Sequence, residues 1–214
     1  MEILYKDAAI TVCIKPPQLL SEQTPDKKGL ADLIAAENGG YVGVVHRLDR
    51  GVGGVMVYAN TPDAAAKLSA AVQSHAFQKE YLAVVHGVPE RTEDTLTDLL
   101  FHDRRCNKSF VVDRKRAGVK EAILDYVLQK SENVEPLGRL SLLRVRLHTG
   151  RTHQIRVQFS SRKMPLVGDG KYGATGDKHP IALFSAHLSF PHPEDGRKMS
   201  FDALPTGGIW DTLL

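Results

Sequence analysis

The apolar positions of this 214-residue chain fall mostly in short runs that are typical of β-strands. These runs are rich in β-branched and aromatic residues or alternate with period two, which is the pattern of a half-buried strand. They predict strands at residues 3–5, 10–15, 54–58, 81–85, 122–128, 140–147, 181–190 and 198–201. Long connections are expected at 86–96 and 103–119.

Two helices are marked by their first turns. Thr61 is a predicted N-cap, and Pro62 follows at the first turn, where its missing N–H costs nothing. An apolar stripe then extends to about residue 75. The second helix is expected after residue 150, with Thr152 as its N-cap and with Ile155 and Phe159 at i and i+4.

Many strands and few helices predict a mixed α/β (α+β) fold with a mainly antiparallel sheet. The chain has no internal repeat, no low-complexity tract and no long linker. The nearest candidate for a linker, residues 18–29, is expected to form a surface loop before a short helix at 30–37. We therefore expect one domain that spans residues 1–214.

The composition is that of an ordinary globular protein, with 42% hydrophobic and 25% charged residues. Cys13 and Cys106 form no CxxC pair and are expected to be reduced thiols in a cytoplasmic protein. The N-terminus lacks the pattern of a signal peptide, and no apolar stretch approaches the roughly 18 residues that cross a bilayer. We expect no membrane partner, and a monomer is the default state.

The formal net charge of +3 allows a polyanionic partner but does not require one. Local clustering is more informative. Between Asp103 and Lys120 there are seven basic residues and two acidic ones. The basic ones are Arg104, Arg105, Lys108, Arg114, Lys115, Arg116 and Lys120, and a second group follows at Arg144, Arg146, Arg151 and Arg156. A solvated face and a phosphate-binding face both fit this pattern.

Residues 44–59, VVHRLDRGVGGVMVYA, place a cluster of charge between two apolar runs. The carboxylate of Asp49 is expensive to bury there unless a cation pairs with it. In an extended chain Arg47 shares the face of Asp49 but shields the carboxylate only partly. A cation from elsewhere is therefore implied, and the arginine-rich segment 147–159 offers Arg156 on the apolar face of its helix.

Five motifs occur in a fixed order along the chain. They are HRLDRGVGG at 46–54, KEYLAVVHG at 79–87, LHTGRTHQIRV at 147–157, PLVGDGKYG at 165–173 and LFSAHLSFPHP at 183–193. Together they resemble the RluA-type family of RNA pseudouridine synthases, over nearly the whole chain. The resemblance implies a pseudouridine synthase-like fold around a central cleft, no cofactor, and structured RNA, ribosomal or transfer, as the partner.

The resemblance also implies roles for particular residues. Asp49 stands at the position of the catalytic aspartate, and Arg156 at that of the basic residue that pairs with it. Tyr81 matches the tyrosine that stacks on the target base and takes part in removing the C5 proton. Arg47 falls near the space that the everted base leaves. Further RNA contacts are expected from His46, Arg50, Arg151, His153 and Gln154.

Physical chemistry agrees with these roles. The isomerisation needs no redox step and no external nucleophile, so one ionised carboxylate suffices, whether it attacks carbon or abstracts a proton. A nearby guanidinium keeps an aspartate ionised, because it lowers the pKa of the carboxyl and itself stays protonated. The uracil must leave its stack to be turned, and an aromatic ring can hold it there.

Two other chemistries fit less well. His46, His148 and His153 suggest a metal, but no carboxylate or cysteine completes a ligand spacing, and capping or phosphate contact is the better interpretation. GDGKYG at 168–173 satisfies GxGxxG, yet it follows a helix and no helix pattern follows it in 174–180. A turn-rich loop is expected there instead. An oxidoreductase would require that a dinucleotide stabilise the protein.

The sequence also departs from the family. Val52 and Gly53 stand where a Thr-Ser pair is common, so hydroxyls that could fix the turn behind Asp49 are missing, and Gln158 stands where histidine is frequent. These departures leave a second hypothesis open, an RNA-binding or RNA-folding module that has lost turnover. It predicts RNA affinity without product.

Overall fold

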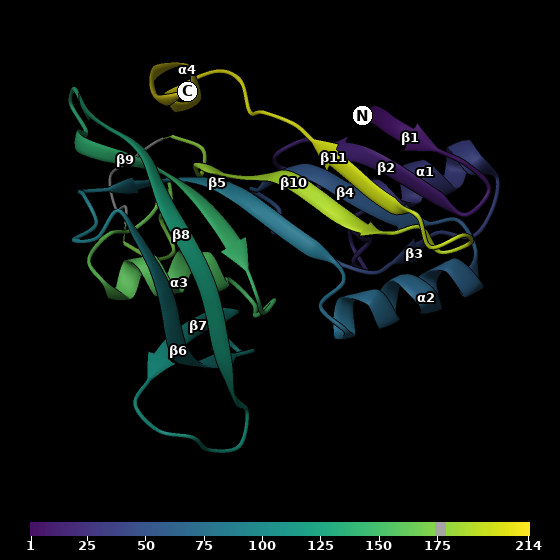
Figure 1. Cartoon of the computed structure of the whole chain (residues 1–214), viewed down its shortest axis with the longest axis horizontal. Coiled ribbons are helices and arrows are strands. Elements are labelled where there is room, and N and C mark those ends of the chain that lie inside the picture. The colour runs from purple at the N-terminus through teal and green to yellow at the C-terminus, as the bar shows by residue number, and fades with distance from the viewer. Residues whose placement is uncertain (174–178) are drawn as a thin grey trace. The chain divides into compact units, whose positions relative to one another are not determined.

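The computed structural model describes residues 1–173 and 179–214, which form two compact units (Figure 1). Unit 1 comprises Met1–Glu80 and Phe184–Pro205. Unit 2 comprises Tyr81–Leu183 and Thr206–Leu214. The expectation of a single domain over 1–214 stays a prediction.

Unit 1 is a small sheet with two helices. Its elements are β1 (Glu2–Lys6), β2 (Ile10–Lys15), α1 (Leu30–Asn38), β3 (Gly43–Val44), β4 (Gly53–Ala59), α2 (Pro62–Gln73), β10 (Leu183–Pro191) and β11 (Lys198–Asp202). The strand order is β1-β2-β4-β10, with β3 paired to β4 and β11 paired to β10. Only the β4–β10 pair is parallel among these pairs of the described residues.

The core of unit 1 lies between α2 and the sheet. The helix buries Ala64, Leu68 and Ala71 in a cluster that strands β2, β4 and β10 share. Thr61 caps the helix as predicted, since its hydroxyl accepts a hydrogen bond from the Ala64 amide at 3.1 Å. The helix ends at Gln73, slightly before the predicted residue 75.

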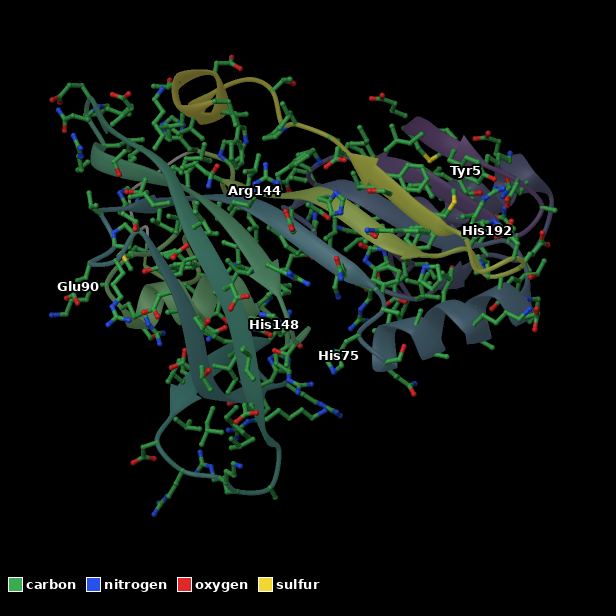
Figure 2. All side chains as sticks on the ribbon, viewed as in Figure 1. Tyr5, His75, Glu90, Arg144, His148 and His192 are labelled. Atoms are coloured by element: carbon green, nitrogen blue, oxygen red, sulfur yellow. The ribbon has the colours of Figure 1, made fainter. Side chains whose placement is uncertain are left out.

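A charged cluster joins the two turns at one end of this sheet. Tyr5 and His192, labelled in Figure 2, each bond Oδ2 of Asp7 at 2.8 Å. The same Asp7 accepts hydrogen bonds from the Ala9 and Ile10 amides. The carboxylate thereby ties the β1–β2 turn to the residues that follow β10.

Unit 2 is an antiparallel sheet with one packed helix. Its elements are β5 (Gln78–His86), β6 (Glu93–Asp103), β7 (Lys108–Val112), β8 (Val119–Val134), β9 (Gly138–Leu147), α3 (Gln154–Ser161) and α4 (Ile209–Leu213). The strand order is β5-β9-β8-β6-β7, and the pairs β6–β7, β6–β8 and β8–β9 are antiparallel. Val157 of α3 packs against Leu100 and Ala122 from the sheet.

The predicted mixed α/β class with a mainly antiparallel sheet is confirmed, while several boundaries were wrong. Strands β6 and β7 were not predicted and occupy part of the expected connections, because their mixed polar and apolar residues conceal the alternation. Helix α3 begins after His153, whose left-handed φ of 54° ends the preceding turn, and not after Thr152. Strand β10 begins at Leu183, and α4 was not predicted.

Gly54 is required where β4 meets β10. Its φ is +123°, and a Cβ atom there would lie 2.3 to 2.7 Å from backbone atoms of Ser185. Neither backbone can retreat without breaking the strand pairing. The glycine thus allows the parallel contact that places the residues before β4 next to the start of β10.

Replacing Gly54 with alanine should destabilise the protein strongly. We expect Gly54→Ala to lower the free energy of unfolding by more than about 3 kcal/mol, from backbone strain and collision together. Gly138→Ala is the control, because Gly138 also has a positive φ of +77° but faces open space. It should cost about 1 to 2 kcal/mol. Equal losses in chemical denaturation would contradict the role of close approach.

Candidate active site

Asp49 lies in a loop before β4 whose backbone is fastened on both sides. The Ser21 hydroxyl donates to the Leu48 carbonyl at 2.9 Å and accepts from the Leu48 amide at 3.1 Å. On the other side the Gln18 amide donates to the Arg50 carbonyl at 2.8 Å. The half-buried carboxylate is therefore carried by a rigid segment, as a positioned acid requires.

A buried lysine completes this fastening. Lys15 is fully buried, and its Nζ donates to the carbonyls of Leu19 at 2.7 Å, Pro16 at 3.0 Å and Arg50 at 3.3 Å. Burial lowers the pKa of Lys15 to about 8, and the charge of Asp49 acts in the opposite direction. Sequence analysis missed this residue, although a lysine that ends an apolar strand was a usable signal.

The turn behind Asp49 closes without the hydroxyls that the family resemblance led us to expect there. The Val52 amide donates to the Asp49 carbonyl at 2.9 Å, and the Val52 side chain is buried. Gly53 lies so close to Pro17 and the Lys15 carbonyl that a Cβ would approach within 3.1 to 3.2 Å. Backbone bonding and close packing hold the turn in this chain.

The charged neighbours of Asp49 differ in exposure. Arg47 is exposed and pairs with Glu22, while Arg50 is exposed and donates from Nε to the Gln18 carbonyl at 3.2 Å. Both guanidiniums are placed where a phosphate could compete for them. Their contact with RNA stays a prediction.

His46 lies inside unit 1. Its Nε2 accepts a hydrogen bond from the Val57 amide at 3.1 Å, and its ring meets the edge of Phe77 at 5.1 Å between centroids. Burial lowers the pKa of His46 to about 3, so the ring is neutral with its proton on Nδ1. The bonds found here are internal, and an RNA contact for His46 stays a prediction.

Arg156 of α3 is held by a carboxylate that the sequence analysis did not anticipate. Its Nε and Nη2 donate to Oδ2 and Oδ1 of Asp169 at 2.7 and 2.8 Å. The Arg156 side chain is 11% exposed and that of Asp169 is fully buried. The predicted pairing of Arg156 with Asp49 stays a prediction. The signal for Asp169 was present in the motif GDGKYG.

Tyr172 lies against the same guanidinium. Its ring centroid is 5.1 Å from Cζ of Arg156, which is a cation–π distance. The Tyr172 hydroxyl accepts from the Ser109 amide at 2.7 Å and bonds Nδ1 of His153 at 2.9 Å. Burial raises the pKa of Tyr172, so the hydroxyl stays protonated. The predicted role of His153 as an RNA contact is untested.

Segment 168–173 is a series of turns, as expected. Gly168 has φ +74°, and a Cβ there would lie 2.4 Å from the carbonyl oxygens of His179 and Pro180. The segment supports an arginine side chain in this structure. The expectation that no helix follows it falls partly on 174–178, outside the described residues.

The turn before α3 is fastened to β8. Gln154 is buried, and its Oε1 accepts from the Arg151 amide at 3.0 Å while its Nε2 donates to the Ile123 carbonyl at 3.1 Å. Nε of Arg151 donates to the Glu121 carbonyl at 2.7 Å. These bonds set the start of α3 and hence the position of Arg156. RNA contacts by Arg151 and Gln154 stay predictions.

Tyr81 lies on a strand of unit 2, and His148 lies just after the end of β9 in the same unit. Tyr81 is on β5 and is only 6% exposed, so a stacking role for its ring stays a prediction. His148, labelled in Figure 2, bonds Oδ2 of Asp125 at 2.6 Å, and Thr95 donates to Oδ1 of the same carboxylate.

Within residues 1–173 and 179–214 no group of three or more His, Cys, Asp or Glu could hold a metal.

Residues 103–120 form what we call the basic hairpin, made of the end of β6, all of β7 and the start of β8. Two of its cations lie over aromatic rings: Nζ of Lys108 is 5.9 Å from the ring of Phe110 in the hairpin, and Cζ of Arg116 is 5.2 Å from the ring of Phe101, just before it. Phe110 is 42% exposed. An exposed ring among cations is typical of surfaces that bind unpaired nucleotides.

Solved structures share this fold. The structure of human RNA pseudouridylate synthase domain containing 1 matches 95% of this chain and 83% of its own with a TM-score of 0.79 at 21% sequence identity. Human RNA pseudouridylate synthase domain containing 4 matches 94% and 87% with a TM-score of 0.73. The fold is therefore that of a pseudouridylate synthase domain.

Sequence comparison identifies the family. The family model described as RNA pseudouridylate synthase matches residues 9–161. An uncharacterized RNA pseudouridine synthase of Aquifex aeolicus is 33% identical over 94% of this chain and 68% of its own length. Ribosomal large subunit pseudouridine synthase D of Zymomonas mobilis is 35% identical over 75% of this chain and 52% of its own. This chain belongs to the RNA pseudouridylate synthase family, whose members are isomerases.

Two further expectations concern membrane-spanning segments and the state of the two cysteines. In the described part of the chain, no helix is long and apolar enough to span a membrane. Cys13 is buried and Cys106 is exposed, and both thiols are free.

The buried Lys15 should give the protein an alkaline stability gain. The pKa of Lys15 is about 8 in the folded protein and 10.5 for an ordinary lysine, so between these pH values the unfolded chain binds one more proton than the folded one. Stability should therefore rise with pH there, by up to about 3 kcal/mol relative to Lys15→Met. Denaturant titrations of both proteins from pH 7 to alkaline pH test this; parallel curves would show that the lysine is not desolvated.

Proposed function

We propose that this protein isomerises specific uridines in structured RNA to pseudouridine, with Asp49 as the catalytic aspartate. The observation that carries the proposal is the family match over residues 9–161, which includes Asp49, Tyr81 and Arg156 in their motifs. The fastening of the Asp49 loop by Ser21 and Lys15 supports it, because a catalytic carboxylate needs a fixed position.

The proposed reaction is balanced within the nucleotide. The N1–C1′ bond breaks, the uracil turns, C5 bonds to C1′, and the C5 proton is replaced by one at N1. Asp49 acts as an ionised carboxylate, either by attack on carbon or by proton abstraction. Arg156 supports its charge, and Tyr81 holds the flipped base. No oxidant, reductant or external nucleophile takes part.

Ribosomal RNA is the first substrate class to test. The relative from Zymomonas mobilis and one from Pseudomonas aeruginosa, 32% identical over 98% of this chain, are both named ribosomal large subunit pseudouridine synthase D. Transfer RNA is the alternative. The basic hairpin suits either, because its cations can bind phosphates and its exposed Phe110 offers a stacking surface.

Loss of the Asp49 carboxylate should abolish turnover. We expect Asp49→Asn to convert uridine at least about 1,000-fold more slowly on ribosomal and transfer RNA transcribed in vitro, with pseudouridine mapped by sequencing. Asp26→Asn, at an exposed site in the same unit, should match wild type.

The outcomes separate the two hypotheses. Product with wild type and none with Asp49→Asn supports the enzyme. RNA binding by wild type without any product would instead favour the RNA-binding module. Equal product from both proteins would contradict the assignment of Asp49.

Charge reversal on the basic hairpin should weaken RNA binding. Arg114→Glu combined with Lys115→Glu should reduce affinity at least about tenfold at low salt and make the salt dependence shallower. The control is Arg91→Glu with Lys130→Glu, two exposed cations of unit 2 outside the hairpin. Fluorescence anisotropy with a labelled RNA hairpin measures both. Equal losses for the two pairs would show that only net charge matters.

A further inference from the structure

We propose that Asp169 and Tyr172 are positioning residues that fix the guanidinium of Arg156 for the isomerisation. The inference rests on the proposed function, since it assigns a task to Arg156 in that reaction. It adds two residues, both in segment 168–173, to which nothing in the family resemblance gave a role.

The first support is the geometry of the ion pair. Asp169 receives Nε and Nη2 of Arg156 on its two oxygens, at 2.7 and 2.8 Å. Two parallel bonds from Nε and Nη2 fix both the plane and the rotation of a guanidinium, which one bond would not. Because the Asp169 side chain is fully buried, water does not compete for these bonds.

The second support is the ring of Tyr172. It lies 5.1 Å from Cζ of Arg156, so it restricts motion of the guanidinium out of its plane. The ring is itself held, because its hydroxyl accepts from the Ser109 amide and its carbonyl accepts from the Ser160 hydroxyl. Asp169 therefore sets the direction of the arginine, and Tyr172 restricts its remaining movement.

The third support is the rigidity of the segment itself. The Asp169 amide donates to the Leu166 carbonyl and the Tyr172 amide donates to the Asp169 carbonyl, both at 3.1 Å. Gly168 lies in contact with the backbone of residues 179 and 180, so the turn has no room to shift. The two residues are thus held before any RNA binds, which is how preorganisation contributes to rate.

Charge accounting separates positioning from simple electrostatic support. Asp169 is an anion, so Asp169 itself adds no positive charge for a reacting carboxylate. A buried arginine without a partner would cost several kcal/mol, and it would also occupy several orientations. The contribution of Asp169 to the reaction is therefore orientation, and it should vanish when Arg156 is absent.

A double-mutant cycle on turnover tests this dependence. Asp169→Asn should lower kcat about 10- to 100-fold with KM for RNA unchanged. Arg156→Gln should lower kcat further, and the double variant should be no slower than Arg156→Gln alone, because Asp169 acts only through the arginine. The double variant removes both buried charges together, so it should fold. If Asp169→Asn does not fold, Tyr172→Leu takes its place in the same cycle, with Tyr172→Phe as the variant that keeps the ring.

Asp98→Asn is the matched control. Asp98 pairs with Arg162 just beyond the same helix, at 2.8 Å, in a similar two-bond arrangement. Its loss should lower stability while kcat stays near wild type. Wild-type kcat for Asp169→Asn, or multiplicative losses in the double variant, would overturn the inference. Wild-type kcat for Arg156→Gln would instead contradict the role of the arginine in the proposed function.

Discussion

Burial of positive charge is the constraint on which the candidate residues of each unit depend. A cation removed from water must be given oxygen partners, or the fold loses several kcal/mol. Lys15 meets this constraint with three backbone carbonyls, and Arg156 meets it with the carboxylate of Asp169. In each unit, satisfying one buried cation also immobilises the segment that carries a motif residue.

The consequences differ between the units. In unit 1 the partners of Lys15 are backbone atoms, and one of them belongs to Arg50, next to Asp49. The lysine therefore fixes the backbone conformation of the loop that carries Asp49. In unit 2 the partner of Arg156 is a side chain on a rigid series of turns. This partner therefore fixes the orientation of the Arg156 guanidinium itself. In the proposed reaction, both arrangements would reduce the reorganisation that is required.

Local sequence signals predicted the elements whose residues follow one pattern, either apolar periodicity or helix capping. The Thr61 cap and most strand positions followed from periodicity and capping alone. Strands β6 and β7 did not, since pairing of β6 with β8 and of β7 with β6 stabilises them more than their own composition does. The start of α3 was displaced because His153 adopts a left-handed conformation that no propensity of histidine indicates.

The sequence named candidate site residues but not the contacts that hold them, for a related reason. Motif order made Asp49 and Arg156 candidates, and their roles stay predictions, whereas the contacts of Asp169 and Lys15 join segments separated along the chain. A buried ion pair becomes visible only when the fold brings its partners together. The string GDGKYG suggested a nucleotide loop by pattern, but its aspartate and tyrosine are used to hold an arginine.

The central claim is that one carboxylate and one guanidinium act on the same flipped uridine. An experimental structure of the protein bound to an RNA hairpin that contains its target uridine tests this most directly. The account predicts that the Asp49 carboxylate and the Arg156 guanidinium lie about 4 to 6 Å apart, and that both lie beside the everted nucleotide. A target uridine bound with Asp49 facing open water, or with Arg156 remote from it, would contradict the account.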